Sequence, residues 1–117
     1  MKQNERTIQK AVIKYLSDRE KFVRDLTYLH VPNEGKRMPH TGAYLKAQGL
    51  RAGAPDLIVW PKNKPTLQIE LKSWTGRQSE AQKNFEVALK NLNHNYHLLK
   101  CENGAHAVKQ IEELLHG

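Results

Sequence analysis

Residues 53–72 of this chain read GAPDLIVWPKNKPTLQIELK, and they decide its fold. Two apolar runs, 57–60 and 67–71, flank the five-residue segment 61–65, which contains two prolines, two lysines and an asparagine. Runs rich in Leu, Ile and Val on either side of a short polar turn predict an antiparallel β-hairpin. The hairpin is therefore expected to supply two neighbouring strands of a sheet.

The predicted hairpin brings two acids and a lysine together. If it folds symmetrically about Asn63, Asp56 lies opposite Glu70 with the two Cβ atoms roughly 5 Å apart. Strand side chains alternate with a period of two, so Lys72 shares that face. Two carboxylates this close repel each other and favour a cation between them. Mg²⁺ and Mn²⁺ prefer carboxylate oxygens and can activate a water beside a phosphodiester, so the pattern indicates metal-assisted hydrolysis.

The same residues also fit a strand that carries one polar face and no site. Two features favour a site, since Asp56 directly precedes an apolar run and Glu70 interrupts another. The third feature that favours a site is the charge of the chain. Nineteen Lys and Arg against twelve Asp and Glu give a net charge of +7 and a pI near 9.6. Clustered Lys and Arg release counterions when they bind nucleic acid, so a chain this basic favours a phosphate-rich partner.

Length and composition limit the classes of protein to which the chain can belong. A chain of 117 residues with a mean hydropathy of −0.74 suits one polar globular domain, expected over residues 1–117. The single cysteine, Cys101, excludes an internal disulfide and a CxxC zinc site. The N-terminal MKQNERTIQK lacks an apolar signal core, and no apolar run approaches about 18 residues. We therefore expect an intracellular, cytoplasmic protein without a membrane span.

Periodic patterns predict further elements before the hairpin. A helix of about four turns begins near Asn4, with an apolar stripe of Ile8, Ala11, Val12, Tyr15 and Leu16. Residues 25–31 alternate as a strand that ends before a proline. Residues 33–54 hold four glycines and four Lys or Arg, which predicts a mobile basic loop. A short helix within it is expected to have Thr41 as N-cap and Gly49 as its stop.

Elements after the hairpin complete an α/β pattern. The segment 79–82 has the Ser-x-x-Gln form of a capping box and begins a helix with an expected buried side of Ala81, Phe85, Ala88, Leu89 and Leu92. A strand is expected over 96–101, and then a helix with Val108, Ile111, Leu114 and Leu115 facing inward. The order αβββαβα predicts a mixed central β-sheet flanked by helices. Trp60 and Trp74 are interpreted as packing groups rather than base-stacking platforms.

Two more polar residues are expected near the acids. Glu5 precedes Ile8 by three residues, so it extends the buried stripe into the first turn of the first helix. It either favours the helix dipole there or acts at the site, contacting the waters of a metal ion or binding a second one. Gln82 either only caps its helix or also hydrogen-bonds a water or phosphate at the site.

The run Gly53-Ala54-Pro55-Asp56 followed by Glu70-Leu71-Lys72 resembles the motif of the PD-(D/E)xK nuclease superfamily. More closely, the chain resembles the standalone form of the virus-type replication-repair nuclease (VRR-NUC) domain. Supporting segments cover nearly the whole chain: Glu5 and Gln9, 30–33, 35–37, 49–53, 76–79 and Gln82. The resemblance implies a restriction-endonuclease-like core and DNA cleavage that depends on Mg²⁺ or Mn²⁺.

The resemblance also implies a role for each site residue. The metal ligands would be Asp56, Glu70 and the backbone carbonyl of Leu71, with Glu5 as the carboxylate of the first helix. Lys72 would position the attacking water, and Gln82 would match the glutamine that follows the core strands. Standalone members are similar to homodimers that act on branched DNA such as Holliday junctions in replication, repair or recombination, in bacterial or phage-infected cells.

The predicted function is therefore a metal-dependent DNA endonuclease that needs no small-molecule cofactor. Basic residues that flank the site in sequence are the candidates for phosphate contacts: Lys36, Arg37, Lys46, Arg51 and Arg77. One alternative is a non-catalytic nucleic-acid-binding module, although a binder has no need for two facing acids. Another is a nuclease that acts on RNA, or a restriction-like or nicking nuclease without junction preference.

Overall fold

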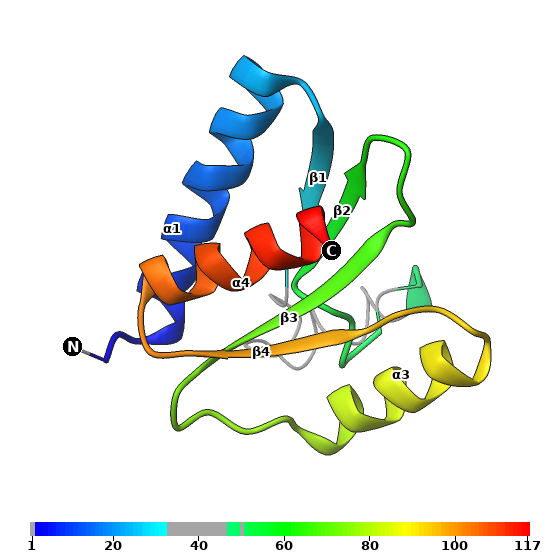
Figure 1. The fold of residues 1–117 in the computed structure, drawn as a ribbon. Coiled ribbons are helices and arrows are strands. Elements are labelled where there is room, and N and C mark those ends of the chain that lie inside the picture. The colour runs from blue at the N-terminus through cyan, green and yellow to red at the C-terminus, as the bar shows by residue number, and fades with distance from the viewer. Residues whose placement is uncertain (1, 33–46, 50) are drawn as a thin grey trace.

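The computed structural model describes residues 2–32, 47–49 and 51–117 and confirms the predicted order of elements. Along the chain these are α1 (Glu5–Asp18), the π-helical segment η1 (Arg19–Val23), β1 (Leu26–His30), β2 (Leu57–Pro61), β3 (Leu67–Ser73), α3 (Glu80–Asn91), β4 (His97–Cys101) and α4 (Gly104–His116) (Figure 1). No helix formed by the described residues is both long and apolar enough to cross a membrane.

The structure describes the predicted basic loop only in part and contains one helical segment that was not predicted. Most of the predicted basic loop over 33–54, with its helix N-cap Thr41, lies outside the described residues. Gly49, the predicted helix stop, is described and has a φ of 104°, a left-handed conformation that suits a residue following a helix. The π-helical segment was not predicted, because it continues α1 without interruption until Arg24 adopts a left-handed φ of 61°.

The strands form one mixed sheet in the order β1-β2-β3-β4. The first two pairings are antiparallel, and β3 pairs with β4 in parallel across the α3 crossover. In the β2–β3 hairpin Leu57 faces Ile69 and Val59 faces Leu67, which is the predicted register symmetric about Asn63. Asn63 itself has a φ of 58° and lies in the turn. The α/β class and the mixed sheet are thus confirmed.

The core lies between one face of the sheet and the helices α1 and α4. Its buried apolar side chains come from both helices and from the sheet: Ile8, Val12, Leu16, Leu26, Leu57, Val59, Leu67, Ile69, Leu71, Leu99, Cys101, Ala107, Ile111 and Leu115. Full burial of one such aliphatic side chain is worth about 1.5–3 kcal/mol. The two helices approach closely at Gly104, where a Cβ would lie 2.4 Å from the Cβ of Ala11. The other face of the sheet carries Glu70 beside Leu98 and Gln68 beside Ile58, so polar and apolar side chains alternate there.

Helix α3 is less buried than predicted. Its capping box at Ser79 and Gln82 is confirmed, but Gln82 is its one fully buried residue and Leu92 is 70% exposed. An amphipathic pattern shows which side of a helix is less polar, and it does not show how far a neighbour covers that side. Trp60 and Trp74, interpreted as packing groups, are each 42% exposed, so each packs with only part of its surface.

Candidate active site

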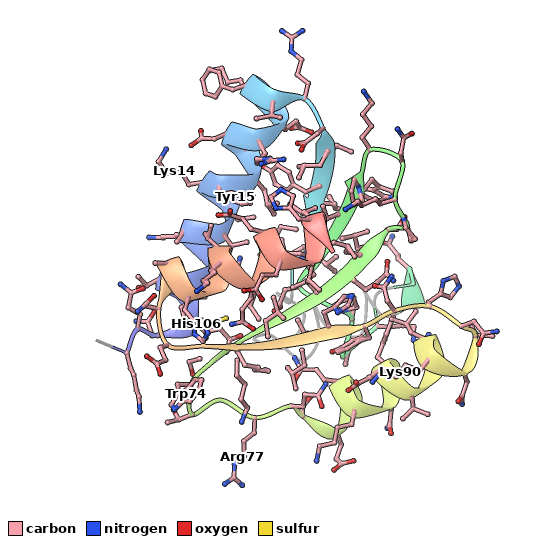
Figure 2. The ribbon with its side chains drawn as sticks, in the orientation of Figure 1. Lys14, Tyr15, Trp74, Arg77, Lys90 and His106 are labelled. Carbon is pink, nitrogen blue, oxygen red and sulfur yellow. The ribbon has the colours of Figure 1, made fainter. Side chains whose placement is uncertain are left out.

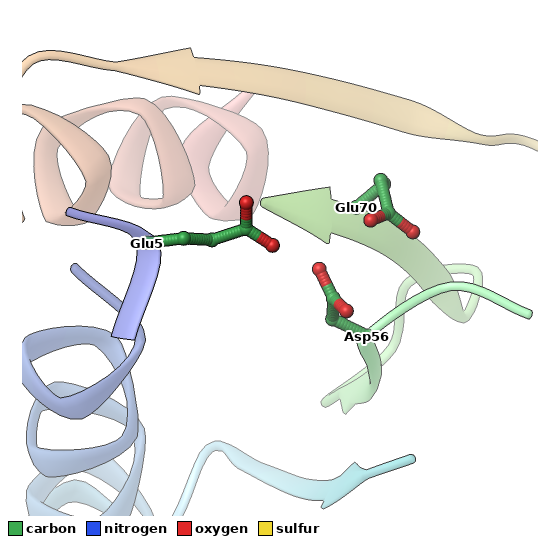
Figure 3. A group of neighbouring side chains, drawn as sticks. All are labelled: Glu5, Asp56 and Glu70. Atoms are coloured by element: carbon green, nitrogen blue, oxygen red, sulfur yellow. The ribbon is translucent and has the colours of Figure 1, made fainter. Parts of the chain in front are cut away.

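Three carboxylates from distant parts of the sequence meet at one end of the sheet. Asp56 lies just before β2, Glu70 in the middle of β3, and Glu5 at the first position of α1 (Figure 3). One oxygen of each carboxylate lies within 4.8 Å of the others. Extending the observed hairpin register by one pair places Asp56 opposite Glu70, as predicted. Helix α1, which packs on the sheet, adds the third acid.

Asp56 is anchored through both its backbone and its side chain. Its carbonyl oxygen accepts a 2.8 Å hydrogen bond from the backbone N–H of Val31, directly after β1. Its Oδ2 accepts a second bond of 2.8 Å from the backbone N–H of Leu71 in β3. The segment after β1 therefore fixes the backbone of Asp56, and β3 fixes its carboxylate, which is buried.

Glu70 is completely buried and is the electrostatic centre of the group. Its Oε2 accepts a 2.7 Å hydrogen bond from Gln82 Nε2 and lies 3.7 Å from Lys72 Nζ, and its Oε1 is 3.5 Å from the Tyr96 hydroxyl. Burial, reinforced by the charge of Asp56, raises the pKa of Glu70 to about 8, while Lys72 acts in the opposite direction. A positive charge beside Glu70 would favour its ionised form.

Gln82 reaches Glu70 because both ends of its side-chain amide are used. The carbonyl oxygen Oε1 accepts a 2.8 Å hydrogen bond from the backbone N–H of Ser79, which closes the capping box. The Nε2 group is then free of the cap and points to Glu70. The predicted capping role is confirmed, and the same side chain also contacts Glu70, whereas its predicted hydrogen bond to a water or phosphate stays a prediction.

Gly53 fixes the first turn of α3 next to the segment that carries Asp56. Its φ is 90°, and a Cβ built there would lie 2.2 Å from the carbonyl oxygen of Ala81. No side chain fits this contact, so glycine is required for both the conformation and the close approach. The Gly-Ala-Pro-Asp run thereby holds Gln82 at the site.

Helix α1 is tied to the end of β1, which places Glu5. Asn4 caps the helix by accepting a 2.8 Å hydrogen bond from the backbone N–H of Thr7. One turn after Glu5, Gln9 Nε2 lies 2.9 Å from His30 Nε2 in β1. Glu5 is half-buried among these contacts. Its position next to Asp56 and Glu70 is thus set by helix-to-strand contacts that a linear pattern does not specify.

The predicted phosphate contacts divide into two groups. Arg51 is exposed, and its guanidinium lies 4.9 Å from the centre of the Phe85 ring in α3. Arg77 is exposed in the segment between β3 and α3 and points away from the protein (Figure 2). The remaining three candidates, Lys36, Arg37 and Lys46, lie outside the described residues.

Two residues near the site were missed by sequence reasoning. Lys100 in β4 is the Cα partner of Lys72 in the parallel β3–β4 pairing, and it is exposed. Tyr96, just before β4, is buried with its hydroxyl near Glu70, and burial there raises the pKa of the phenol. Neither was accessible from the sequence, because strand 96–101 was predicted without a partner strand or a register.

A family model of the VRR-NUC domain matches residues 3–103, so the chain belongs to the VRR-NUC family. Membership of this family makes it a nuclease domain of the PD-(D/E)xK type. Its fold is similar to that of a solved VRR_NUC domain protein, with a TM-score of 0.67 and 22% identity over 96% of this chain and 88% of that one. No protein of curated function matches the sequence.

Proposed function

We propose that this chain is a Mg²⁺- or Mn²⁺-dependent endonuclease that hydrolyses phosphodiester bonds of DNA. One observation carries the proposal: the carboxylates of Glu5, Asp56 and Glu70 lie within 4.8 Å of one another, and Lys72 Nζ is 3.7 Å from Glu70. A domain that only binds DNA gains nothing from burying two acids and a lysine together, because such a group is costly without a function.

The donor atoms fit a hard divalent ion. All three members of the cluster offer carboxylate oxygens, which Mg²⁺ and Mn²⁺ prefer. We assign Asp56, Glu70 and the carbonyl of Leu71 as ligands. The carbonyl is favoured because a strand residue directs its N–H and C=O to the same side, and the N–H of Leu71 bonds to Asp56. Glu5 would bind waters of that ion or a second one.

When bound, the ion supplies a Lewis acid that polarises the phosphodiester and lowers the pKa of a water. The protein supplies the positioning. Two backbone N–H groups hold Asp56: that of Val31 donates to its carbonyl oxygen, and that of Leu71 donates to its carboxylate. Lys72 places an ammonium group next to Glu70, where it can orient the attacking water and stabilise negative charge on the phosphate. Gln82 holds the Glu70 carboxylate in its orientation.

Basic residues of the chain would bind the DNA backbone. We propose that Arg51, Arg77 and Lys100 contact phosphates, together with Lys36, Arg37 and Lys46. The net charge of +7 supports this assignment. We further propose that the protein acts on branched DNA as a homodimer inside the cell, because two sites related by symmetry suit paired nicks in opposite strands.

The test is a cleavage assay with plasmid, linear duplex and four-way-junction DNA in EDTA, Mg²⁺ or Mn²⁺. Wild-type protein should cut only with a divalent ion, and junctions faster than duplex. Asp56→Ala and Lys72→Ala should bind the same DNA without cutting it. Cleavage by these variants at the wild-type rate would refute the assigned site, and binding without cleavage by wild type would favour the non-catalytic module. Light scattering that shows a strict monomer with and without DNA would exclude the dimer.

A further inference from the structure

Trp74 is an exposed aromatic side chain in the turn that follows β3, the strand that carries Glu70 and Lys72. It occupies the second position of a tight turn that the N–H of Gly76 closes by donating to the Ser73 carbonyl at 3.0 Å. It follows Lys72 by two residues, and an extended chain spans at most about 3.6 Å per residue, so their Cα atoms lie within roughly 7 Å. Turns favour Gly, Pro, Asn, Asp and Ser for backbone reasons, and none of these reasons explains a tryptophan.

A second ring holds Trp74 in place. The centroid of the His106 ring, on α4, lies 6.2 Å from that of Trp74, with the planes tilted by 49° (Figure 2). The imidazole is itself oriented, because its Nδ1 accepts a 3.1 Å hydrogen bond from the backbone N–H of Glu102. The backbone N–H of His106 is held by Asn103 Oδ1 at 2.9 Å. Such a preoriented ring pair loses little conformational entropy when a flat ligand stacks on it.

One cation, Lys2, lies over the Trp74 ring, and a second basic residue follows Trp74 closely in the sequence. Lys2 Nζ is 5.9 Å from the centre of the Trp74 ring, and Lys2 precedes Glu5 of the acidic cluster by three residues. Arg77, exposed, follows Trp74 by three residues. Exposed aromatic rings accompanied by basic side chains match the way proteins bind single-stranded nucleic acid, with bases on the rings and phosphates on the charges.

We propose that Trp74, supported by His106, is a stacking platform for the base of an unpaired nucleotide next to the scissile phosphate, an inference that rests on the proposed nuclease function. Within a duplex both faces of a base are covered by its neighbours, so only an unpaired base presents a face to the ring. The site therefore selects DNA that has a single-stranded segment or a junction beside the bond to be cut. Trp74 determines specificity and takes no part in the bond cleavage.

Fluorescence tests the stacking directly. The chain has two tryptophans, so Trp60→Phe leaves Trp74 as the only tryptophan reporter. The protein is titrated in Ca²⁺, without cleavage, with a forked DNA, with the fully paired duplex of the same sequence, and with the fork carrying abasic positions in its unpaired arms. We expect quenching by the fork and little quenching by the duplex or by the abasic fork. Equal quenching by all three DNAs would overturn the proposal, and so would stronger quenching by RNA of the same sequence.

Substitutions provide a matched comparison. Loss of one base-stacking contact corresponds to a roughly 5- to 150-fold weaker Kd, so Trp74→Ala should weaken binding of the fork by that factor and leave duplex binding unchanged. Trp74→Phe should restore part of the affinity. Trp60→Ala is the control, because Trp60 is equally exposed but lies in β2 away from the Trp74 turn. An equal loss for both alanine variants, or none for Trp74→Ala, would overturn the proposal.

The inference and the proposed function fail separately. If wild type cuts forks and Trp74→Ala cuts and binds them equally well, the platform is refuted and the nuclease stands. If the fork quenches Trp74 specifically but no divalent ion supports cleavage, the platform stands as a binding site and the nuclease is refuted. Thermal melts of each variant exclude unfolding as the cause of lost binding.

Discussion

The side-chain amide of Gln82 donates a 2.7 Å hydrogen bond to Glu70, which links the first turn of α3 to the middle of β3. The other end of the same amide closes the helix cap on Ser79. One residue therefore couples the formation of a helix end to the orientation of a buried acid. The two roles can be separated, because Ser79 belongs only to the cap.

The first prediction compares Gln82→Leu with Ser79→Ala. Loss of the serine cap should cost about 1 kcal/mol of stability and leave cleavage within about threefold of wild type. Gln82→Leu should lower stability and reduce the cleavage rate at least about tenfold, because Glu70 loses a hydrogen-bond donor in a buried position. Chemical denaturation and single-turnover cleavage measure the two effects. Equal losses of cleavage for the two variants would show that Gln82 only caps the helix.

The second prediction concerns the bond from Leu71 to Asp56. Asp56→Asn keeps an acceptor for the Leu71 N–H, so the protein should fold, but it removes the charge that binds the metal. Mg²⁺ or Mn²⁺ should therefore raise the Tm of wild type and not that of Asp56→Asn. Asp56→Leu should in addition lose about 1–3 kcal/mol, because the buried N–H has no partner. A metal-dependent rise in the Tm of Asp56→Asn equal to that of wild type would contradict the ligand assignment.

The third prediction distinguishes the role of Lys72 in cleavage from the role of Lys100, its neighbour across the β3–β4 pairing, in DNA binding. Lys72→Met should lower the single-turnover cleavage rate by about 10²–10³-fold, which is typical for loss of one group that stabilises charge in a transition state, and change the Kd for DNA little. Lys100→Met should weaken DNA binding and reduce the slope of log Kd against log salt concentration by about one, the value for one phosphate contact. Its cleavage rate at saturating protein concentration should be unchanged. The reverse result would exchange the roles of the two lysines.

The fourth prediction is a pH dependence of stability in metal-free protein. Burial raises the pKa of Glu70 to about 8, so folding favours its protonated form. The contribution of protonated Glu70 to the free energy of unfolding is complete below the ordinary glutamate pKa near 4.5 and is lost as the pH rises through about 8. Glu70→Gln keeps the neutral state at every pH, so its Tm in EDTA should match wild type in acid and exceed it increasingly towards pH 8. A Tm difference that does not change with pH would contradict the raised pKa.

The fifth prediction uses two glycines with left-handed φ angles. At Gly49 a Cβ would meet nothing within 4 Å, whereas at Gly53 it would lie 2.2 Å from the Ala81 carbonyl oxygen. Gly49→Ala should cost about 1 kcal/mol for backbone strain alone. Gly53→Ala should cost clearly more and also reduce cleavage, because it displaces the helix end that holds Gln82. Urea denaturation compares them, and equal free-energy losses would show that the Gly53 contact is not rigid.

Much of the fold follows from local sequence. The register of the β2–β3 hairpin depends on a short turn and two apolar runs only a few residues apart, so these residues alone suffice to place Asp56, Glu70 and Lys72 on one face. The capping box at Ser79 is equally local. Family resemblance rests on the same segments, and for this reason it identified the class of nuclease correctly.

Contacts between distant segments could not be obtained in this way. The strand over residues 97–101 can be predicted from the sequence, but its parallel register with β3, which places Lys100 beside Lys72, cannot. The helix of Gln82 is recognisable from the sequence, but the close approach of Gly53 that directs Gln82 to Glu70 is not. The exposure that remains at Leu92 and Trp74 is likewise not visible in the sequence. Alternation and helical periodicity describe one segment at a time, so they determine the face on which a residue lies. Which segment covers that face, and how completely, is decided only when non-local packing brings α1, the sheet and α3 together.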